Sequence, residues 1–249
     1  MKKLTTLLFG LSLMAITAMG QTADEIIANY FENTGGYENW GKLKGIKILA
    51  KAQQQGLEFP LEIVQMSDGK QYTKITFQGQ ELFQGVFDGT TLWNHNFQTM
   101  KAEKADEENL NNFKLNLNDF PDSFYDYKKK GYTIELVGKE TVEGTETFKI
   151  KLVKEPLTVD GQKVEDISYY YFDTENFVPI VQENEIRSGP SKGAIGQAIL
   201  SDYQEVNGFY FPFTMTQGIK DGPSSPLTIE AIEINPEVDE KVFKFPEGN

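Results

Sequence analysis

The residues that could carry out catalysis are few. His95 is the only histidine, and the chain contains no cysteine. A zinc site made of several histidines or thiolates therefore cannot form, and a catalytic dyad could use only this one imidazole. His95 follows Trp93 in strand alternation, so we expect a hydrogen-bonded structural histidine rather than a catalytic one.

Two other patterns would suggest hydrolysis. Residues 189–193, G-P-S-K-G, match the G-x-S-x-G nucleophile pattern, which requires a strand, a sharp turn and a helix. Here a charged, glycine-rich loop joins two expected strands. Glu183 and Glu185 could form a glycosidase pair, but nothing distinguishes them from the other acidic residues. We therefore predict that the protein is not an enzyme and that it has no metal or cofactor.

The net charge narrows the range of partners. The chain carries 24 basic and 37 acidic side chains, a net charge of −13. Without residues 1–20, which contain Lys2, Lys3 and no acid, the net charge falls from −13 to −15. Such a charge opposes binding to nucleic acid or to an anionic bilayer surface. It suits a protein that stays dissolved while it carries apolar cargo.

The start of the chain has the pattern of a secretory signal peptide. An apolar stretch runs from Leu4 to Ile16, and the small residues Ala18 and Gly20 precede a cleavage site before Gln21. The stretch is short for a membrane span, although an uncleaved anchor is the alternative. No cysteine follows the cleavage site, so we expect an unlipidated periplasmic protein without an integral membrane segment.

Residues 21–249 predict one domain made mainly of strands. No linker, low-complexity run or repeat divides them. Apolar segments bounded by turn residues are expected to form strands. They are 46–54, 57–66, 71–78, 80–87, 91–96, 132–138, 145–154, 167–173, 178–186, 195–206, 209–217 and 227–234. About eleven or twelve antiparallel strands exceed a comfortable flat sheet, which indicates a single highly curved sheet, an incomplete β-barrel.

The hairpin at 80–94 carries apolar groups on both faces. Asp88-Gly89 favours a two-residue turn, as does Asn207-Gly208 further along the chain. An antiparallel sheet in a globular protein normally leaves one face to water. The second face of this hairpin must therefore be covered by a helix or by a ligand.

Two regions predict helices. Residues 22–33 have Thr22 as a cap, and a short turn around Trp40 and Leu43 follows. The segment 101–130 interrupts the strands and predicts two short helices, the second beginning at Pro121. We expect residues 24–31 and 113–125 to lie as helices on the concave face of the sheet. This insert could form the wall of a cavity, or it could be ordinary core packing.

A cavity between the insert and the sheet would bind apolar cargo. Strand alternation places Leu61 with Ile63 on one face, and Phe83 with neighbouring odd positions of its strand. The candidate lining residues are Leu61, Ile63, Phe77, Phe83, Trp93, Phe113, Phe120 and Phe124. A solvent-shielded apolar space of a few hundred Å³ is expected there, as in apolar ligand sites generally.

A set of motifs follows in a fixed order along the chain. It comprises F-D-G-T-T-L-W at 87–93, Y-T-I-E-L-V-G-K-E-T-V-E-G at 132–144, Y-Y-Y-F-D-T-E-N-F-V-P-I at 169–180, Y-Q-E-V-N-G-F-Y-F-P at 203–212 and V-D-E-K-V-F-K-F-P at 238–246. In this order the chain resembles the LolA-like periplasmic lipoprotein carriers and their Bacteroidetes relatives, the outer-membrane lipoprotein-sorting proteins. The resemblance implies an incomplete β-barrel with helices against its concave face, and lipoprotein acyl chains between them.

One position departs from the family. The lipoprotein carriers have an arginine in an early strand that holds the lid region closed, whereas Arg187 is the only arginine here. Lys70 or Lys74 lies nearest the expected place, and neither has a guanidinium group. The resemblance implies a carrier of lipoprotein acyl chains that works with membrane complexes of the envelope. The alternative is an envelope scaffold protein whose own helices fill the cavity.

Overall fold

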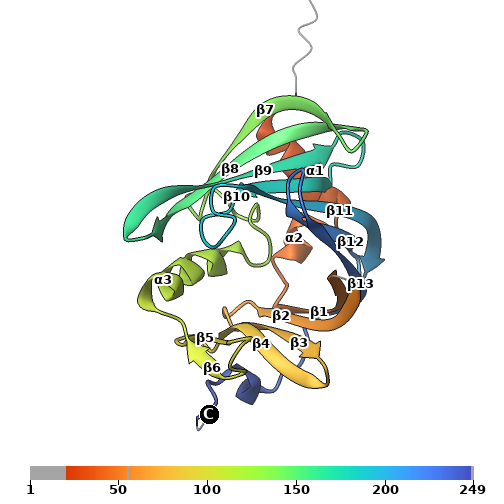
Figure 1. Ribbon diagram of the computed structural model, residues 1–249. Helices are drawn as coiled ribbons and strands as arrows, with labels where there is room; N and C mark the ends of the chain where they lie inside the picture. Colours follow the sequence, from red (N-terminus) through yellow and green to blue (C-terminus); the bar gives the residue numbers. More distant parts are fainter. Residues whose placement is uncertain (1–20, 55, 248–249) are drawn as a thin grey trace, which may run out of the picture.

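The computed structural model describes residues 21–54 and 56–247, so the predicted signal peptide lies outside the described residues. The described strands form one antiparallel sheet (Figure 1). They are β1 (Gly45–Gln54), β2 (Leu57–Met66), β3 (Gln71–Phe77), β4 (Gln80–Phe87), β5 (Leu92–His95), β6 (Ala102–Lys104), β7 (Thr133–Val142), β8 (Thr145–Val159), β9 (Gln162–Asp173), β10 (Pro179–Glu185), β11 (Ile195–Val206), β12 (Phe209–Ile219) and β13 (Ser224–Ile234).

The sheet is open, and its two halves meet at its centre. The strand order is β6-β5-β4-β3-β2-β1-β13-β12-β11-β10-β9-β8-β7. β1 pairs with β13, from Ile46 opposite Ile234 to Ala52 opposite Leu227. The edges are β6 and β7, which follow one another in sequence. The predicted single, highly curved antiparallel sheet is confirmed, and β6 is the one strand that was not predicted.

The two predicted two-residue turns have different outcomes. At Asn207-Gly208 both residues have positive φ, and Val206 pairs with Phe209, so the prediction is confirmed. At Asp88-Gly89 it is wrong, because Phe87 pairs with Leu92 across a four-residue loop. The Asp88 carboxylate accepts hydrogen bonds from the backbone amides of the two threonines that follow Gly89, at 2.8 and 2.7 Å. This side-chain-to-backbone bonding favours the wider loop.

Helix α1 (Ala23–Asn33) packs on the face of the sheet that we call the inner face. Thr22 and Glu25 form a reciprocal capping box at its start, so the predicted cap is confirmed. The helix buries Ile26 and Phe31. Helix α2 (Tyr37–Trp40) follows and buries Trp40. Together with the buried side chains of β8, β9 and β12, these helices form the main core. No helix in the described part of the chain is long and apolar enough to cross a membrane.

The insert differs from the prediction of two helices over 101–130. Its residues 102–104 form the edge strand β6. Helix α3 (Glu107–Asn116) begins after Asp106, whose side chain accepts from the Asn109 amide at 2.8 Å, and the short 3₁₀ helix η1 (Leu117–Asp119) follows. The second predicted helix is absent, because residues 120–131 form turns and Asp126 has a φ of 52°. The prediction for 113–125 is thus right only for its beginning.

The C-terminal segment covers the outer face of β2 to β5. Its 3₁₀ helix η2 (Glu240–Phe243) buries Phe243 among Val64, Tyr72, Val86 and Trp93. The Trp93 indole N–H donates to the Phe243 carbonyl at 3.0 Å. The second apolar face of the 80–94 hairpin is therefore closed by the protein's own chain.

His95 is hydrogen-bonded in this outer cluster, as predicted. Its Nδ1 accepts the backbone N–H of Phe83 at 2.9 Å, and its ring centroid lies 5.4 Å from that of Trp93. Burial lowers the pKa of His95 below its usual value. Nδ1 can accept this hydrogen bond only while it is unprotonated.

Replacing Phe243 tests the outer cluster. Phe243 is 1% exposed, and we expect Phe243→Ala to lower the free energy of unfolding by about 3–5 kcal/mol, as for other buried aromatic truncations. Phe97, which is 59% exposed, is the matched control, and Phe97→Ala should change stability little. Urea unfolding measures both. Equal losses in the two variants would show that η2 does not close the outer face.

The lowered pKa of His95 predicts a specific pH dependence of stability. The His95 imidazole binds a proton near pH 6.5 in the unfolded chain and only at lower pH in the folded protein. Its contribution to the free energy of unfolding is therefore fully present above about pH 6.5. It is lost as the pH falls through the folded-state pKa. As the pH falls from 8 to 5.5, the urea midpoint of the wild type should therefore fall relative to that of His95→Gln. A constant difference over this range would contradict the assignment.

Candidate functional site

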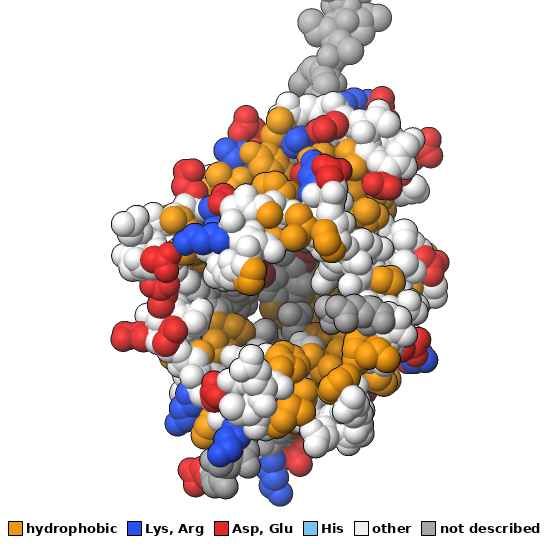
Figure 2. Space-filling model, viewed as in Figure 1, with side chains coloured by type: hydrophobic (Ala, Val, Ile, Leu, Met, Phe, Trp, Pro, Cys, Tyr) orange, Lys and Arg blue, Asp and Glu red, His pale blue; other side chains and the backbone are white. Residues whose placement is uncertain are grey.

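An uncovered apolar surface lies on the inner face of β1, β2 and β3. Residues opposite one another in antiparallel strands share a face, and Ala50, Leu61, Ile75 and Leu82 are successive partners across β1 to β4. On the outer side of the same strands, Val64 and Tyr72 are buried by η2, whereas Leu61 and Ile75 on the inner side remain half-buried. Apolar side chains gather below the hollow in the middle of Figure 2. This part of the inner face is therefore open to a ligand.

The surface forms a groove of about 620 Å³, which we call the apolar groove. Its lining is Ala52, Gln53, Leu57, Phe59, Leu61, Thr73, Ile75, Phe77, Phe97, Gln217, Ser225, Pro226 and Leu227. None of these side chains is charged. The ring centroids of Phe59 and Phe77 lie 5.5 Å apart, and Leu57 and Phe97 are 57% and 59% exposed. Concentrated apolar exposure of this kind is typical of a binding surface.

The structure places three of the eight predicted lining residues on this face. Leu61 and Phe77 line the groove, and Ile63 lies on the same face of β2, opposite Thr73. Phe83 and Trp93 lie on the outer face, packed against the C-terminal segment. The two-residue turn between β3 and β4 pairs Phe77 with Gln80, so the even positions at the start of β4, such as Leu82, face inward and Phe83 faces outward. A register shift further along β4 reverses this alternation, so Val86 lies in the outer cluster. The assignment of Phe83 to the cavity was therefore wrong.

The three aromatic residues of the insert lie elsewhere. Phe113 on α3 packs against Phe87, with ring centroids 5.2 Å apart. Phe120 lines a small cavity of about 90 Å³, and Phe124 is buried in the main core beside Tyr170. The insert does not form the opposing wall of the apolar groove. Whether any of the eight residues binds a ligand stays a prediction.

Sequence reasoning missed Phe59, Ile75 and Phe97 as lining residues. Phe59 and Ile75 alternate with Leu61 and Phe77 on their strands, so the pattern contained the signal for both once the inner face was known. Phe97 belongs to the loop between β5 and β6. No periodicity marks a loop residue, so its place at the groove follows only from the three-dimensional structure.

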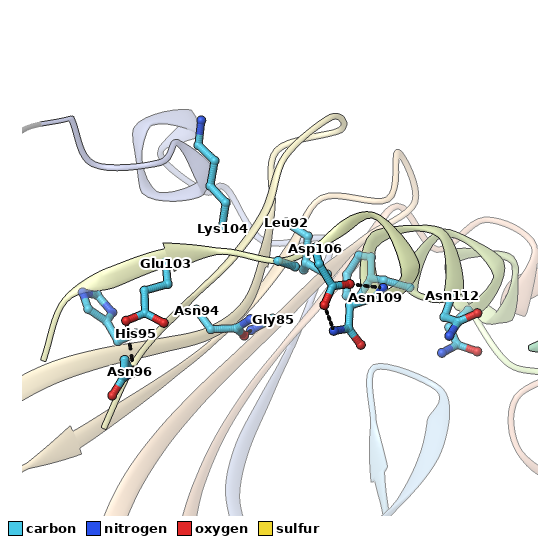
Figure 3. Close-up of a pocket in the computed structure, with 13 residues that line it drawn as sticks. Gly85, Leu92, Asn94, His95, Asn96, Glu103, Lys104, Asp106, Asn109 and Asn112 are labelled. Carbon is cyan, nitrogen blue, oxygen red and sulfur yellow. Dashed lines mark hydrogen bonds between the residues drawn. The ribbon is translucent and has the colours of Figure 1, made fainter. Parts of the chain in front are cut away.

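A second cavity, also of about 620 Å³, lies between α3 and strands β4 to β6 (Figure 3). We call it the asparagine pocket, because Asn94, Asn96, Asn109, Asn112 and Asn116 line it. The remaining lining residues are Gly85, Leu92, His95, Glu103, Lys104, Ala105, Asp106 and Phe113. The pocket thus combines amide groups with a small apolar surface. No group of three or more metal-binding side chains occurs in the described ranges.

Helix α3 connects the two ends of the open sheet, as Figure 1 shows. It follows the edge strand β6, and it binds the tip of the β8–β9 hairpin. The Asn112 side chain exchanges two hydrogen bonds with the Thr158 backbone, at 2.6 and 2.8 Å. The Glu108 carboxylate accepts the backbone amides of Asp160 and Gly161 at 3.0 and 2.9 Å. α3 therefore spans the gap between the two edges.

A lysine holds η1 against the sheet. The Lys154 ammonium on β8 lies 2.8 Å from Asp119 in η1 and 3.2 Å from Asp166 on β9. Burial alone would lower the pKa of Lys154, but the two carboxylates raise it above its usual value. Lys70 and Lys74, which lie nearest to the family arginine in sequence, form ion pairs with other residues. The ion pair between the insert and the sheet is therefore made by Lys154 on β8 and not by Lys70 or Lys74.

The sequence patterns for hydrolysis lie in ordinary structural settings. Ser191 is in the loop between β10 and β11, without a following helix. Glu183 accepts hydrogen bonds from Tyr171 and Gln197 and lies 2.8 Å from the Lys220 ammonium. Burial alone would raise the pKa of Glu183, but these partners hold it below its usual value. Glu183 is therefore the charged centre of an ion-pair network.

Comparison with known proteins identifies the fold. No protein-family model and no curated protein matches the sequence. A DUF1329 family protein from Desulfovibrio piger has a similar structure, with a TM-score of 0.52 and 11% identity over 84% of this chain and 92% of that one. A LolA superfamily protein from Nitrosomonas europaea gives a TM-score of 0.52 and 12% identity, over 90% of this chain and 98% of that one. The chain therefore has a LolA-like fold.

Proposed function

We propose that this protein is a periplasmic carrier that binds lipidated or otherwise apolar cargo, such as the acyl chains of a lipoprotein, in the apolar groove. The proposal rests on the uncovered inner face of β1 to β3, where a groove of about 620 Å³ has no charged side chain in its lining. Transfer of an acyl chain from water to such a surface stabilises the complex by roughly 0.8 kcal/mol for each buried methylene. The LolA-like fold supports the same function.

The alternative is a scaffold protein whose own helices fill the concave face. Helices α1 and α2 do fill the inner face near β8, β9 and β12. In the part of the chain that the structure describes, however, neither they nor α3 contribute a residue to the apolar groove. The exposed Leu57 and Phe97 favour a carrier, because exposed apolar groups are not needed to pack a scaffold.

The proposed carrier acts in the periplasm together with membrane complexes of the envelope. An exported carrier would take its cargo from one envelope membrane complex and deliver it to another, in the sorting of outer-membrane lipoproteins. It would use no catalytic residue and no cofactor. Its net charge, −15 without residues 1–20, would keep it away from anionic bilayer surfaces, so that delivery depends on a protein partner.

A charge placed in the groove should abolish binding. We expect Leu61→Asp to weaken the binding of a fluorescent fatty acid at least tenfold, because an acyl chain would have to desolvate the new carboxylate. Val137→Asp is the matched control, since Val137 is 50% exposed on the edge strand β7 and does not line the groove. Fluorescence titration measures both. If folded Leu61→Asp binds like wild type, the groove is not the site.

Filling the groove should exclude cargo that co-purifies. Ala52 lines the groove, and Ala52→Trp places an indole in the space proposed for an acyl chain. We expect native mass spectrometry to detect lipid on the wild-type protein exported from cells. The Ala52→Trp variant should carry much less. Equal lipid on both proteins, or none on the wild type, would favour the scaffold alternative.

A further inference from the structure

The asparagine pocket is built to form hydrogen bonds with an uncharged group. The Asn94 Oδ1 accepts the Gly85 amide at 2.6 Å, and the Asn109 Nδ2 donates to Asp106 at 2.9 Å. Among residues 21–54 and 56–247, the Asn94 Nδ2 and the Asn109 Oδ1 have no hydrogen-bond partner. The half-buried Asn94 thus leaves one free donor in the pocket, and the exposed Asn109 leaves one free acceptor at its rim. A polyol has several hydroxyl groups, each of which donates and accepts, so it has a partner for each of these two atoms.

The charges of the pocket disfavour an anion. Glu103 and Asp106 are the carboxylates in the lining. The one ammonium in the lining, on Lys104, lies 4.8 Å from the centre of the Phe245 ring. Phe245 belongs to the outer cluster, and Figure 3 shows Lys104 pointing away from Asn94 and Asp106. A phosphate or carboxylate in the pocket would therefore meet two like charges and no facing cation.

The pocket and the apolar groove border successive residues of one loop. Asn96 lines the pocket, and Phe97, the next residue, lines the groove. The Asn96 side chain holds the loop in place, because its Oδ1 accepts the Gln98 amide at 2.9 Å and its Nδ2 donates to Glu103 at 3.0 Å. An amphiphile that lies along this loop would have its chain in the groove and its head in the pocket.

We propose that the asparagine pocket binds the neutral, hydroxyl-bearing head group of an amphiphile, a sugar or a glycerol, whose acyl chain occupies the apolar groove. This inference rests on the proposed function and names the class of cargo. Asn94 and Asn109 supply the donor and the acceptor, and Leu92 and Phe113 form the apolar floor. Glu103 and Asp106 exclude anionic head groups. The carrier therefore selects its cargo by the head as well as by the chain.

The test compares ligands that share a twelve-carbon chain. Dodecyl maltoside, dodecyl phosphate and dodecanoic acid are titrated by calorimetry below their micelle concentrations, together with maltose, which lacks the chain. We expect the wild type to bind dodecyl maltoside more tightly than either anionic ligand, and maltose weakly. Equal binding of the three chain-bearing ligands would overturn the head-group inference and leave the carrier function standing. Binding of none of them would overturn both, and maltose binding as tight as that of dodecyl maltoside would overturn the single-amphiphile arrangement.

Two variants locate the head group. Asn109→Leu should weaken dodecyl maltoside binding roughly three- to tenfold, as expected for one lost hydrogen bond, and leave dodecanoic acid binding unchanged. Asn111→Leu is the matched control, because Asn111 lies on the same helix, is exposed and does not line the pocket. Glu103→Lys should shift the preference toward dodecyl phosphate. The pocket does not bind the head group if Asn109→Leu binds dodecyl maltoside as tightly as the wild type and the control Asn111→Leu do, and if Glu103→Lys still prefers dodecyl maltoside to dodecyl phosphate.

Discussion

The pairing of β1 with β13 is the constraint on which the rest of the structure depends. It joins the first and last strands at the centre of the sheet, so both edges come from the middle of the chain. The insert between β6 and β7 must therefore span the opening between the edges. Helix α3, which has no fully buried residue, is held to the tip of the β8–β9 hairpin by hydrogen bonds of Glu108 and Asn112. The Lys154–Asp119 ion pair follows it. The sheet keeps its hollow because α3 lies across the opening, whereas the edge strands β6 and β7 do not pair with each other.

The apolar side chains are divided among three surroundings. Near β8, β9 and β12 the inner face is filled by α1, α2 and residues such as Phe124. The outer face of β2 to β5 is filled by η2 through Phe243. The inner face of β1 to β3 has no such cover in the described residues, and there the apolar groove remains. Among the described residues, the inner face of β1 to β3 is thus an apolar surface that the chain itself leaves uncovered.

Much of the fold could be predicted from the sequence, because strands and turns are encoded locally. Twelve strands and α1 follow from alternation, turn dipeptides and a capping box. The site was harder to predict, since it depends on which face each strand turns inward. A two-residue turn exchanges odd and even positions, which is why Phe77 faces inward and Phe83 outward. The asparagine pocket gathers residues from three strands, two loops and a helix, and no periodicity in the sequence marks them as one site.

The central β1–β13 pairing also determines the order in which the protein can fold. Ile46 and Ile234 are partners although 188 positions separate them in the chain, from 46 to 234. Loop closure over such a distance is slow compared with the formation of local hairpins. Until the last strand arrives, β1 and β12 expose unpaired backbone edges that can pair with other chains. The edges of β1 and β12 are therefore the backbone that stays exposed longest during folding.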